Sequence, residues 1–500
     1  MLKNNITEIG FEEKIWKAAC TLRGNIDAAE YKHVILGLIF LKYISDKFEL
    51  RYKQLLKEDR GVEENIDEYT SLNVFFVPVS ARWSSISSYA HEFEIGKKID
   101  EAMVEIEKEN SKLKGILPKN YARPELDKRR LGDVVDLFTN ISMSEHSDAK
   151  DILGRIYEYC LAQFAKQEGK LAGEFYTPAC VVKTLVEVIR PFSGRVYDPC
   201  CGSGGMFVQS AKFVEAHAGN INDLSVYGQD SNLTTWKLCQ MNLAIRGIRA
   251  DLGVSASDTF FSDVHPEMKA DYIIANPPFN LSDWGRNKLL EDVRWKYGLP
   301  PAGNANFAWL QHMIHHMSDK GRIAMVLANG SLSSQTIGEG DTRKAIIEDE
   351  LLEGIIAMPT QLFYTTQIPV SLWFLNQAKK QQGKTLFIDA RSMGTMISRR
   401  LRELTDTDVA KITSTFEMFD AGSLEDVKGY CAVVSTEEIA KQGFILTPGR
   451  YVGIKEQEDD GEAFEEKMAR LTGELSEMFK KSHELESEIR KKLRRIGFEL

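Results

Sequence analysis

The stretch that decides the fold is Val196-Tyr197-Asp198-Pro199-Cys200-Cys201-Gly202-Ser203-Gly204-Gly205. An apolar strand ends in an acid, the chain turns through small residues, and a helix follows. Glycines let the backbone approach a ligand because they have no Cβ, and an open helix N-terminus offers N–H groups to an anionic group. A dinucleotide or a methionine carboxylate would fit this turn, and a purely structural turn is the alternative. The candidate binding residues are Asp198, Ser203, Gly204 and Gly205.

Strand-like apolar runs alternate with helical segments from about residue 171 onwards. The runs are residues 195–198 (RVYD), 226–229 (VYGQ), 272–275 (YIIA), 323–328 (IAMVLA), 354–358 (GIIAM) and 371–375 (SLWFL). Amphipathic stretches between them cover residues 232–245 and 307–317. This alternation predicts an α/β domain with a mostly parallel sheet. The pattern loosens past about residue 385, so we expect the last strand of the sheet at 371–375.

A second acid follows the next strand, at Gly228-Gln229-Asp230. In doubly wound sheets an acid in this position hydrogen-bonds ribose hydroxyls. Acids at strand ends are common, so Asp230 alone is a weak candidate. It becomes a useful one because its spacing from Asp198 in the glycine-rich turn matches one βαβ unit.

The third motif is Asn276-Pro277-Pro278-Phe279, directly after a predicted strand. Two consecutive prolines fix φ and remove two N–H donors, and a residue before proline is kept out of helix. Carbonyl oxygens are therefore left unpaired, and an amide oxygen with a backbone carbonyl forms an acceptor pair that suits an exocyclic NH2 group. Accepting both hydrogens increases the electron density on that nitrogen as it attacks a methyl sulfonium. Phe279 offers a face for an extruded base, and a rigid strand-to-loop turn is the alternative.

A fourth motif, Gly173-Glu174-Phe175-Tyr176-Thr177-Pro178, precedes a predicted helix that begins at Ala179. Thr177 followed by proline is good N-capping chemistry. The same segment could instead close over the methionine end of a cofactor, and the residues alone leave both interpretations open.

Asp258, in Ser257-Asp258-Thr259, follows a predicted third strand. A carboxylate there can accept a hydrogen bond from an adenine amino group. An acid in an ordinary loop is the alternative.

The first ~165 residues are predicted to be mostly helical. Ile35, Leu38, Ile39, Leu41, Ile44 and Phe48 form an apolar stripe at helical spacing. We expect an extended piece at residues 73–79 and further helices at 99–109 and 151–167. A helical domain packed for structural reasons is the simplest interpretation of this region.

The C-terminal segment is predicted to be one long helix after an acidic linker at residues 457–462. Its apolar residues follow alternating steps of three and four, with Ser482 and Lys492 as polar interruptions: Phe464, Met468, Leu471, Leu475, Met478, Leu485, Ile489 and Ile496. This spacing is a heptad seam. The helix either folds back on its own domain or packs against a partner helix.

Bulk composition limits the class of protein. The 500 residues are 43% hydrophobic, enough for two or three domains, and the net charge is −10. A protein that grips DNA unaided usually has a basic footprint, so any DNA contact must come from a local basic cleft or a partner subunit. The seven cysteines show no CxxC spacing, which predicts neither a disulfide framework nor a metal site. No signal sequence or membrane span is recognisable, so we expect a cytoplasmic protein.

Together these motifs resemble the N6-adenine methyltransferase family, and their order resembles the modification subunit of type I restriction–modification systems. GEFYTP is similar to the family's motif X, DPCCGSGG to motif I, Asp230 to motif II, Asp258 to motif III and NPPF to motif IV. Residues 15–48 are similar to the helical N-terminal domain of that subunit, and the segments around Phe76 and Trp83 fit as well. The resemblance covers most of residues 10–450, whereas the last ~50 residues match only in being helical. Motif I lacks the phenylalanine-first form of many methyltransferases, which implies that Cys200 and Cys201 are packing residues.

The resemblance implies a Rossmann-like sheet that binds S-adenosylmethionine, an N-terminal all-helical domain and a C-terminal helical tail. The corresponding boundaries are residues 1–165, 166–450 and 451–500. The implied cofactor-binding residues are Glu174, Phe175, Tyr176, Thr177, Pro178, Ala179, Asp198, Ser203, Gly204, Gly205 and Asp230, with Asp258 near the adenine. In the catalytic loop of Asn276, Pro277, Pro278 and Phe279, the first two would orient the target amino group and Phe279 would stack on the flipped adenine.

The resemblance also implies partners. Double-stranded DNA is the substrate, and a separate specificity subunit flanked by two modification subunits reads its sequence. The heptad helix is then a natural docking element, and a restriction subunit is a further partner that the family allows. Phosphate affinity shared across such a complex fits the acidic net charge.

Two other functions remain open on the residues alone. Protein glutamine and RNA methyltransferases also use an Asn-Pro-Pro-aromatic loop, although their aromatic residue is often tyrosine and the long helical N-terminus argues against them. A non-catalytic assembly subunit is the second alternative, which the intact acid, glycines and NPPF loop disfavour.

Overall fold

The structure is a computed structural model that describes residues 28–58, 61–140, 177–336, 338–363, 368–399, 401–454 and 464–495, with residues 16, 20, 22, 157, 159–160 and 163–164. The chain divides into two compact units, Met1–Gly453 and Ile454–Leu500. The helix expected at 151–167 falls mainly outside the described residues. Among the described residues, no helix has both the length and the apolar character needed to cross a bilayer.

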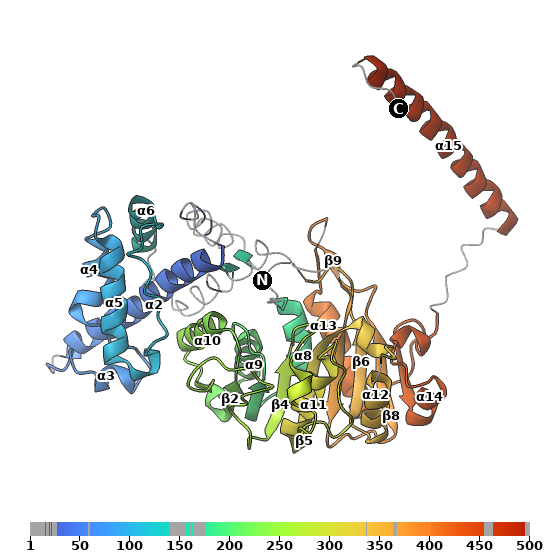
Figure 1. Cartoon of the computed structure of the whole chain (residues 1–500), viewed down its shortest axis with the longest axis horizontal. Coiled ribbons are helices and arrows are strands. Elements are labelled where there is room, and N and C mark those ends of the chain that lie inside the picture. Colours follow the sequence, from blue (N-terminus) through green and yellow to red (C-terminus); the bar gives the residue numbers. More distant parts are fainter. Residues whose placement is uncertain are drawn as a thin grey trace. The chain divides into compact units, whose positions relative to one another are not determined.

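The first unit contains one large sheet. Its strands are β1 (Gly194–Asp198), β2 (Leu224–Gly228), β3 (Ala250–Asp251), β4 (Ala270–Ala275), β5 (Met317–Ala328), β6 (Leu352–Ala357), β7 (Val370–Asn376), β8 (Lys384–Asp389) and β11 (Cys431–Ser435). Within the described residues these nine strands pair in the order β11-β8-β6-β7-β5-β4-β1-β2-β3 (Figure 1). A separate two-stranded hairpin joins β9 (Thr395–Met396) to β10 (Arg402–Glu403).

The sheet is mostly parallel, as the sequence predicts. β3, β2, β1, β4 and β5 run parallel to one another, and β6 runs parallel to β8. Only β7, between β5 and β6, and β11 at the edge are antiparallel to their neighbours. The inserted β7 distinguishes this sheet from the dinucleotide-binding order, in which the sixth strand follows the fifth directly.

Helices cover both faces of the sheet because successive strand residues point to opposite sides. The helices are α8 (Ala179–Ile189), α9 (Gly205–Ala216), α10 (Leu233–Ile245), α11 (Asn306–His316), α12 (Glu339–Glu348), α13 (Asp406–Asp420) and α14 (Thr436–Lys441). Val196 and its face pack in the same core as α8, α9, α10 and α13. Tyr197 and the opposite face pack with α11, α12 and α14. The domain is therefore a three-layer α/β/α structure.

Two strands of the sheet lie beyond the last predicted one. The prediction that the sheet ends at 371–375 is wrong, because β8 and β11 continue it. These strands have six and five residues, and β8 is buried on both faces. Such short strands show no alternation that could reveal them in the sequence.

The N-terminal region is helical, as predicted. Its helices are α2 (Ala28–Glu58), α3 (Asp67–Thr70), α4 (Trp83–Ser87), α5 (Ile95–Glu109) and α6 (Lys128–Thr139). The predicted stripe on α2 is buried, but so are residues between its members, such as Leu36 and Phe40. The reason is a second contact surface, since the Tyr43 hydroxyl on α2 donates a hydrogen bond to the carbonyl of Ile245 on α10.

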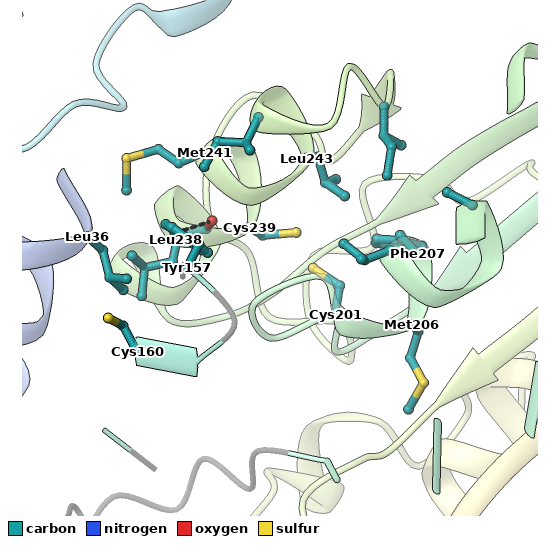
Figure 2. Close-up of a cluster of buried hydrophobic side chains, with 14 of the residues drawn as sticks. Leu36, Tyr157, Cys160, Cys201, Met206, Phe207, Leu238, Cys239, Met241 and Leu243 are labelled. Carbon is teal, nitrogen blue, oxygen red and sulfur yellow. Dashed lines mark hydrogen bonds between the residues drawn. The ribbon is translucent and has the colours of Figure 1, made fainter. Parts of the chain in front are cut away.

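A buried cluster joins this region to α10. Figure 2 shows Leu36, Tyr157 and Cys160 around Leu238 of α10, while Cys239 points toward Cys201 of the glycine-rich turn. The Tyr157 hydroxyl donates to the Leu238 carbonyl over 3.2 Å. Helix α10 therefore lies between the N-terminal helices and the turn that the sequence singles out.

The extended piece at 73–79 does not join a sheet. The side chain of Asn110 replaces a neighbouring strand: its Oδ1 accepts from the Phe76 N–H over 3.0 Å, and its Nδ2 donates to the Phe76 carbonyl over 2.8 Å. Both backbone groups are thus paired although no strand lies beside them.

The second unit contains the helix α15 (Phe464–Arg495). Its heptad seam is exposed, with 44–62% of the surface of Met468, Leu471, Leu475, Met478, Leu485 and Ile489 accessible. The helix thus presents an apolar stripe from Met468 to Ile489, whereas Ile496 and the side chain of Phe464, the ends of the predicted seam, lie outside the described residues.

Replacing Asn110 by alanine should destabilise the helical region by about 2–4 kcal/mol, because two buried backbone groups lose their partners. Urea unfolding of the full chain measures this loss. Asn222→Ala, at an exposed asparagine, is the matched control and should change the free energy of unfolding by less than ~0.5 kcal/mol. Equal effects of the two substitutions would contradict the role of Asn110.

Candidate active site

The candidate residues gather where parallel strands end. β1 pairs with β2 on one side and β4 on the other, with Val196 opposite Val226 and Tyr272. The residues that follow these strands therefore emerge at the same edge of the sheet. Ligands of open α/β sheets bind at this carboxyl edge.

The glycine-rich turn is shaped by positive φ angles. Gly204 precedes α9 with φ +82°, and a Cβ on it would lie 2.9 Å from the Cys239 sulfur. Gly202 has φ +54°. The turn is also held from outside, since the Cys201 N–H donates to the Gln229 carbonyl over 3.0 Å. No side chain caps the N-terminus of α9, so the turn delivers an open helix end to the site.

Asp230 braces this turn. Its carboxylate accepts from the Gly202 N–H over 3.0 Å and from the Asn232 N–H over 2.9 Å. The acid after β2 thus ties the glycine-rich turn to the start of α10. Its predicted contact with ribose hydroxyls stays a prediction.

Asn242 on α10 supports the glycine-rich turn, a role that the sequence analysis did not predict. It is buried on α10, and its Nδ2 donates to the Ser203 carbonyl over 2.6 Å. Arg246, one helical turn later, in turn donates to the Asn242 side chain. In the sequence, this role could have been suspected only because Asn242 is a polar residue on the inward face of the predicted helix 232–245.

Asp198 is an acid with an altered pKa. It is buried and accepts a hydrogen bond from the Cys200 N–H over 3.0 Å. Burial raises the pKa of Asp198 to about 7, and the nearby Asp230 adds to the shift. A buried carboxyl that titrates near neutrality is typical of functional sites.

Asn276 presents an unsatisfied acceptor. Its Nδ2 donates to the Thr177 hydroxyl over 2.8 Å, which fixes the amide plane. Its Oδ1 is buried and has no hydrogen-bond partner among the described residues. A buried polar atom without a partner is uncommon and costly, so this oxygen is placed to accept from a ligand.

Thr177 therefore does not cap the helix that follows it. Pro178 occupies the N-cap position of α8, and no side chain caps that helix. The capping interpretation of Thr177 is wrong, because its hydroxyl is engaged by Asn276 instead. Glu174, Phe175 and Tyr176 lie outside the described residues.

Phe279 is half-buried and meets the ring of Phe363 edge-on, with centroids 5.9 Å apart and planes at 75°. Phe363 follows β6, so it reaches the site from a segment that sequence reasoning left without a role. The loop after Phe279 is fixed as well: the Asn306 side chain on α11 exchanges two hydrogen bonds with Asn280, of 3.0 and 2.9 Å.

Asp258 is exposed and shapes its own loop. It accepts from the N–H groups of Phe260 and Phe261 over 2.9 and 3.3 Å. The preceding Ser257 N–H donates to the Asp230 carbonyl over 2.9 Å. The two acids of the predicted motifs are thus neighbours along the site edge.

A cavity of about 120 Å³ connects several of these groups. Its lining comes from four segments of the chain: Thr177, Ala179 and Val182; Asp198, Cys200, Cys201, Gly202, Ser203, Gly205, Met206, Val208, Gln209 and Lys212; Asn242; and Asn276. Asp230, Asp258, Pro277, Pro278 and Phe279 lie outside the lining. The glycine-rich turn and the predicted catalytic asparagine therefore share one cavity.

The cysteines of the turn are not suited to nucleophilic chemistry. Burial raises the pKa of the Cys200 thiol well above its ordinary value, and a hydrogen bond with Cys239 together with burial does the same for the pKa of Cys201. Both remain thiols at neutral pH, which supports the packing role expected for them.

Asp263, His312 and His316 form a compact buried cluster. The His312 ring binds the Tyr197 hydroxyl and Arg294, and the His316 ring binds the Met268 carbonyl and Asp263, at 2.8–3.1 Å. Burial lowers the pKa of His312 well below its ordinary value. All four ring nitrogens have protein partners, so the cluster is a hydrogen-bond network beneath the sheet.

Comparison with known proteins places the chain in a family. Residues 148–460 match the family described as N-6 DNA Methylase, and residues 11–138 match the HsdM N-terminal domain. The type I restriction enzyme HindI methylase subunit of Haemophilus influenzae is 48% identical over 85% of this chain and 100% of its own length. The MjaIX methylase subunit of Methanocaldococcus jannaschii is 40% identical over 98% of this chain and 92% of its own.

Solved structures agree on the fold. The methyltransferase subunit of a type I restriction–modification system from Streptococcus thermophilus superposes with a TM-score of 0.76, at 23% identity, over 89% of this chain and 99% of its own. The matched family selects DNA adenine over the protein and RNA substrates that the NPPF loop left open, and an enzyme over an assembly subunit. The chain belongs to the N-6 DNA methylase family, as a methylase subunit of the type I restriction enzyme class that uses S-adenosylmethionine.

Proposed function

We propose that Asn276 and the Pro277 carbonyl hold the exocyclic amine of an adenine extruded from duplex DNA while it accepts a methyl group. The observation that carries this role is the buried Asn276 Oδ1 without a partner. Two acceptors match the two hydrogens of an NH2 group. Accepting both increases the electron density on the nitrogen that attacks, and it recovers the cost of about 1–3 kcal/mol for the unpaired oxygen.

Thr177 acts as the positioning residue of this pair. Its hydroxyl holds Asn276 Nδ2 and so directs Oδ1 away from itself. Phe279 then provides the face for the extruded base, and the edge-on ring of Phe363 limits how far the Phe279 ring can turn. The prolines between them keep the loop rigid.

The cavity beside Asn276 has a lining whose chemistry suits S-adenosylmethionine, and its volume of about 120 Å³ accommodates part of that cofactor. When bound, this cofactor supplies the methyl group on a positively charged sulfur. Asp198 gives the cavity a carboxylate that complements a cation, and the open N-terminus of α9 suits a carboxylate group. Thr177, Pro178, Ala179, Ser203, Gly204, Gly205, Asp230 and Asp258 complete the proposed binding set, together with Glu174, Phe175 and Tyr176 of the segment before α8.

The chain further consists of three parts: an N-terminal helical domain (residues 1–165), the catalytic domain (166–450) and a C-terminal segment (451–500). The last part is a docking helix for the specificity subunit, two copies of this chain flank that subunit, and the complex acts in the cytoplasm. The exposed stripe on α15 supports docking, because a soluble helix seldom leaves so many apolar side chains in water without a partner.

Asn276→Ala should lower the rate of DNA methylation by roughly 10²–10³-fold, the usual effect of removing one positioned hydrogen-bonding group in a reaction centre. Asn276→Asp keeps the shape and an acceptor in the place of Oδ1, and the Thr177 hydroxyl can donate to its second oxygen, so this variant should be less impaired than Asn276→Ala. Single-turnover transfer of labelled methyl groups into DNA measures the rate. Calorimetry with S-adenosylmethionine serves as control and should show binding within about threefold of wild type. Wild-type rates in Asn276→Ala would refute the assignment.

S-adenosylmethionine should bind more tightly as the pH rises from 6 to 8. A cationic ligand favours ionised Asp198, whose pKa is about 7 in the free protein, so affinity is reduced below that value and gained above it. The expected change is roughly threefold to tenfold. S-adenosylhomocysteine, which is neutral at sulfur, should show a weaker dependence, and Asp198→Asn should flatten the profile. Identical pH profiles for both ligands would exclude Asp198 as the titrating group.

Leu485→Asp places a charge in the α15 seam and should weaken co-purification with the specificity subunit by at least about tenfold. Ser487→Asp puts the same charge in the same turn, away from the seam, and should leave the complex intact. Deletion of residues 460–500 is the larger version of the test. Unchanged complex formation by the deletion variant would rule out docking through α15.

A further inference from the structure

The β9–β10 hairpin lies at the site edge. It follows β8, which runs parallel to β6, so it leaves the sheet at the end where the catalytic loop emerges. The two short strands pair antiparallel, with Arg402 opposite Met396, and the hairpin projects beyond the sheet (Figure 1). No predicted motif includes this segment.

Two contacts tie the base of the hairpin to the active site. The Arg402 N–H donates to the Gln361 carbonyl over 2.8 Å, in the loop that carries Phe363 and through it contacts Phe279. On the other side Asp406, three residues after the hairpin, forms an ion pair with Lys183 of α8 over 2.7 Å. The hairpin is therefore anchored on both flanks of the Thr177–Asn276 pair.

The base is also rigid. Gly394 has φ +81°, and a Cβ on it would lie 2.8 Å from the Glu403 carbonyl oxygen. The guanidinium of Arg402 donates to the Met393 carbonyl over 2.9 Å. These contacts hold the two strands together at the base of the hairpin.

The surface of the hairpin is basic and apolar in a chain that is acidic overall. Residues 391–402 contain four arginines and no acid, while the whole chain has a net charge of −10. Arg391 is paired with Asp389 and Arg402 is turned inward. Arg399 is exposed and has no ion-pair partner among the described residues, and beside it Met396 and Ile397 are 45% and 54% exposed.

We infer that this hairpin is a DNA-contacting arm, in which Arg399 binds a backbone phosphate near the target adenine and Met396 with Ile397 covers the sugar and base edges exposed when that adenine leaves the stack. A cation beside apolar side chains fits a nucleic acid, whose charge lies on phosphates and whose unstacked bases present apolar faces. The inference rests on the adenine methylation proposed above. It assigns the hairpin to backbone contact and leaves sequence reading to the specificity subunit.

Arg399→Ala and Arg399→Glu, tested in the full chain assembled with its specificity subunit, examine this contact. Titration of a fluorescent duplex from 50 to 200 mM salt gives the affinity and its salt dependence. We expect the Kd for DNA to rise about tenfold in Arg399→Ala and further in Arg399→Glu, and the slope of log K against log salt to fall by roughly 0.9, the value for one lost phosphate contact. Arg399→Lys should restore the slope.

A matched control is Arg249, an exposed arginine beside the start of β3, at the opposite edge of the sheet. Arg249→Glu should leave the Kd for DNA and the salt slope unchanged. A duplex with 2-aminopurine at the target position reports extrusion of the base, which Ile397→Ser should reduce. A wild-type salt slope in Arg399→Glu overturns the inference, and so does an equal loss in Arg249→Glu. Failure of the proposed chemistry would instead appear as normal methylation by Asn276→Ala.

Discussion

The parallel pairing of β1 with β4 is the constraint on which the site depends. With Val196 opposite Tyr272 and Tyr197 opposite Ile273, both strands end at the same edge, and the segments after them must meet there. Gly205 and Asn276 are 71 positions apart in the chain (276 − 205), yet they line one cavity. β5 and β6 run in the same direction because β7, which lies between them in the sheet, is antiparallel to both, so Phe363 after β6 reaches the same edge.

Helix α10 links the glycine-rich turn to the N-terminal region. One side of the helix donates from Asn242 to the Ser203 carbonyl, and its last turn accepts from Tyr43 of α2. The buried cluster of Figure 2 runs from Leu36 through Leu238 and Cys239 to Cys201 without leaving the core. Close-packed protein interiors contain few voids and therefore transmit strain. A shift of α2 would consequently displace the glycine-rich turn.

The motifs could be predicted from local features of the sequence, whereas the hydrogen-bond partners of several motif residues depend on tertiary contacts. The strand ends at Asp198 and Ala275 and the loop Asn276-Pro277-Pro278-Phe279 were predictable because proline, glycine and strand periodicity act over a few residues. The partner of Asn276 was not, since Thr177 lies 99 positions away and its hydroxyl looks like a helix cap in the sequence. Asn242 and Phe363 escaped for the same reason. β8 and β11 were missed because five or six buried residues show no period.

Net charge and local charge have to be separated in this protein. At physiological ionic strength the field of a charge is screened within about 8–10 Å, so a phosphate responds to the side chains around it and barely to the −10 of the whole chain. The arginine-rich segment 391–402 can therefore attract DNA although the chain is acidic. Arg399, which is exposed and has no ion-pair partner among the described residues, gives a shallow salt dependence and little affinity by itself. Phosphate contacts from another subunit would add to this affinity, because each further neutralised phosphate contributes its own salt-dependent share.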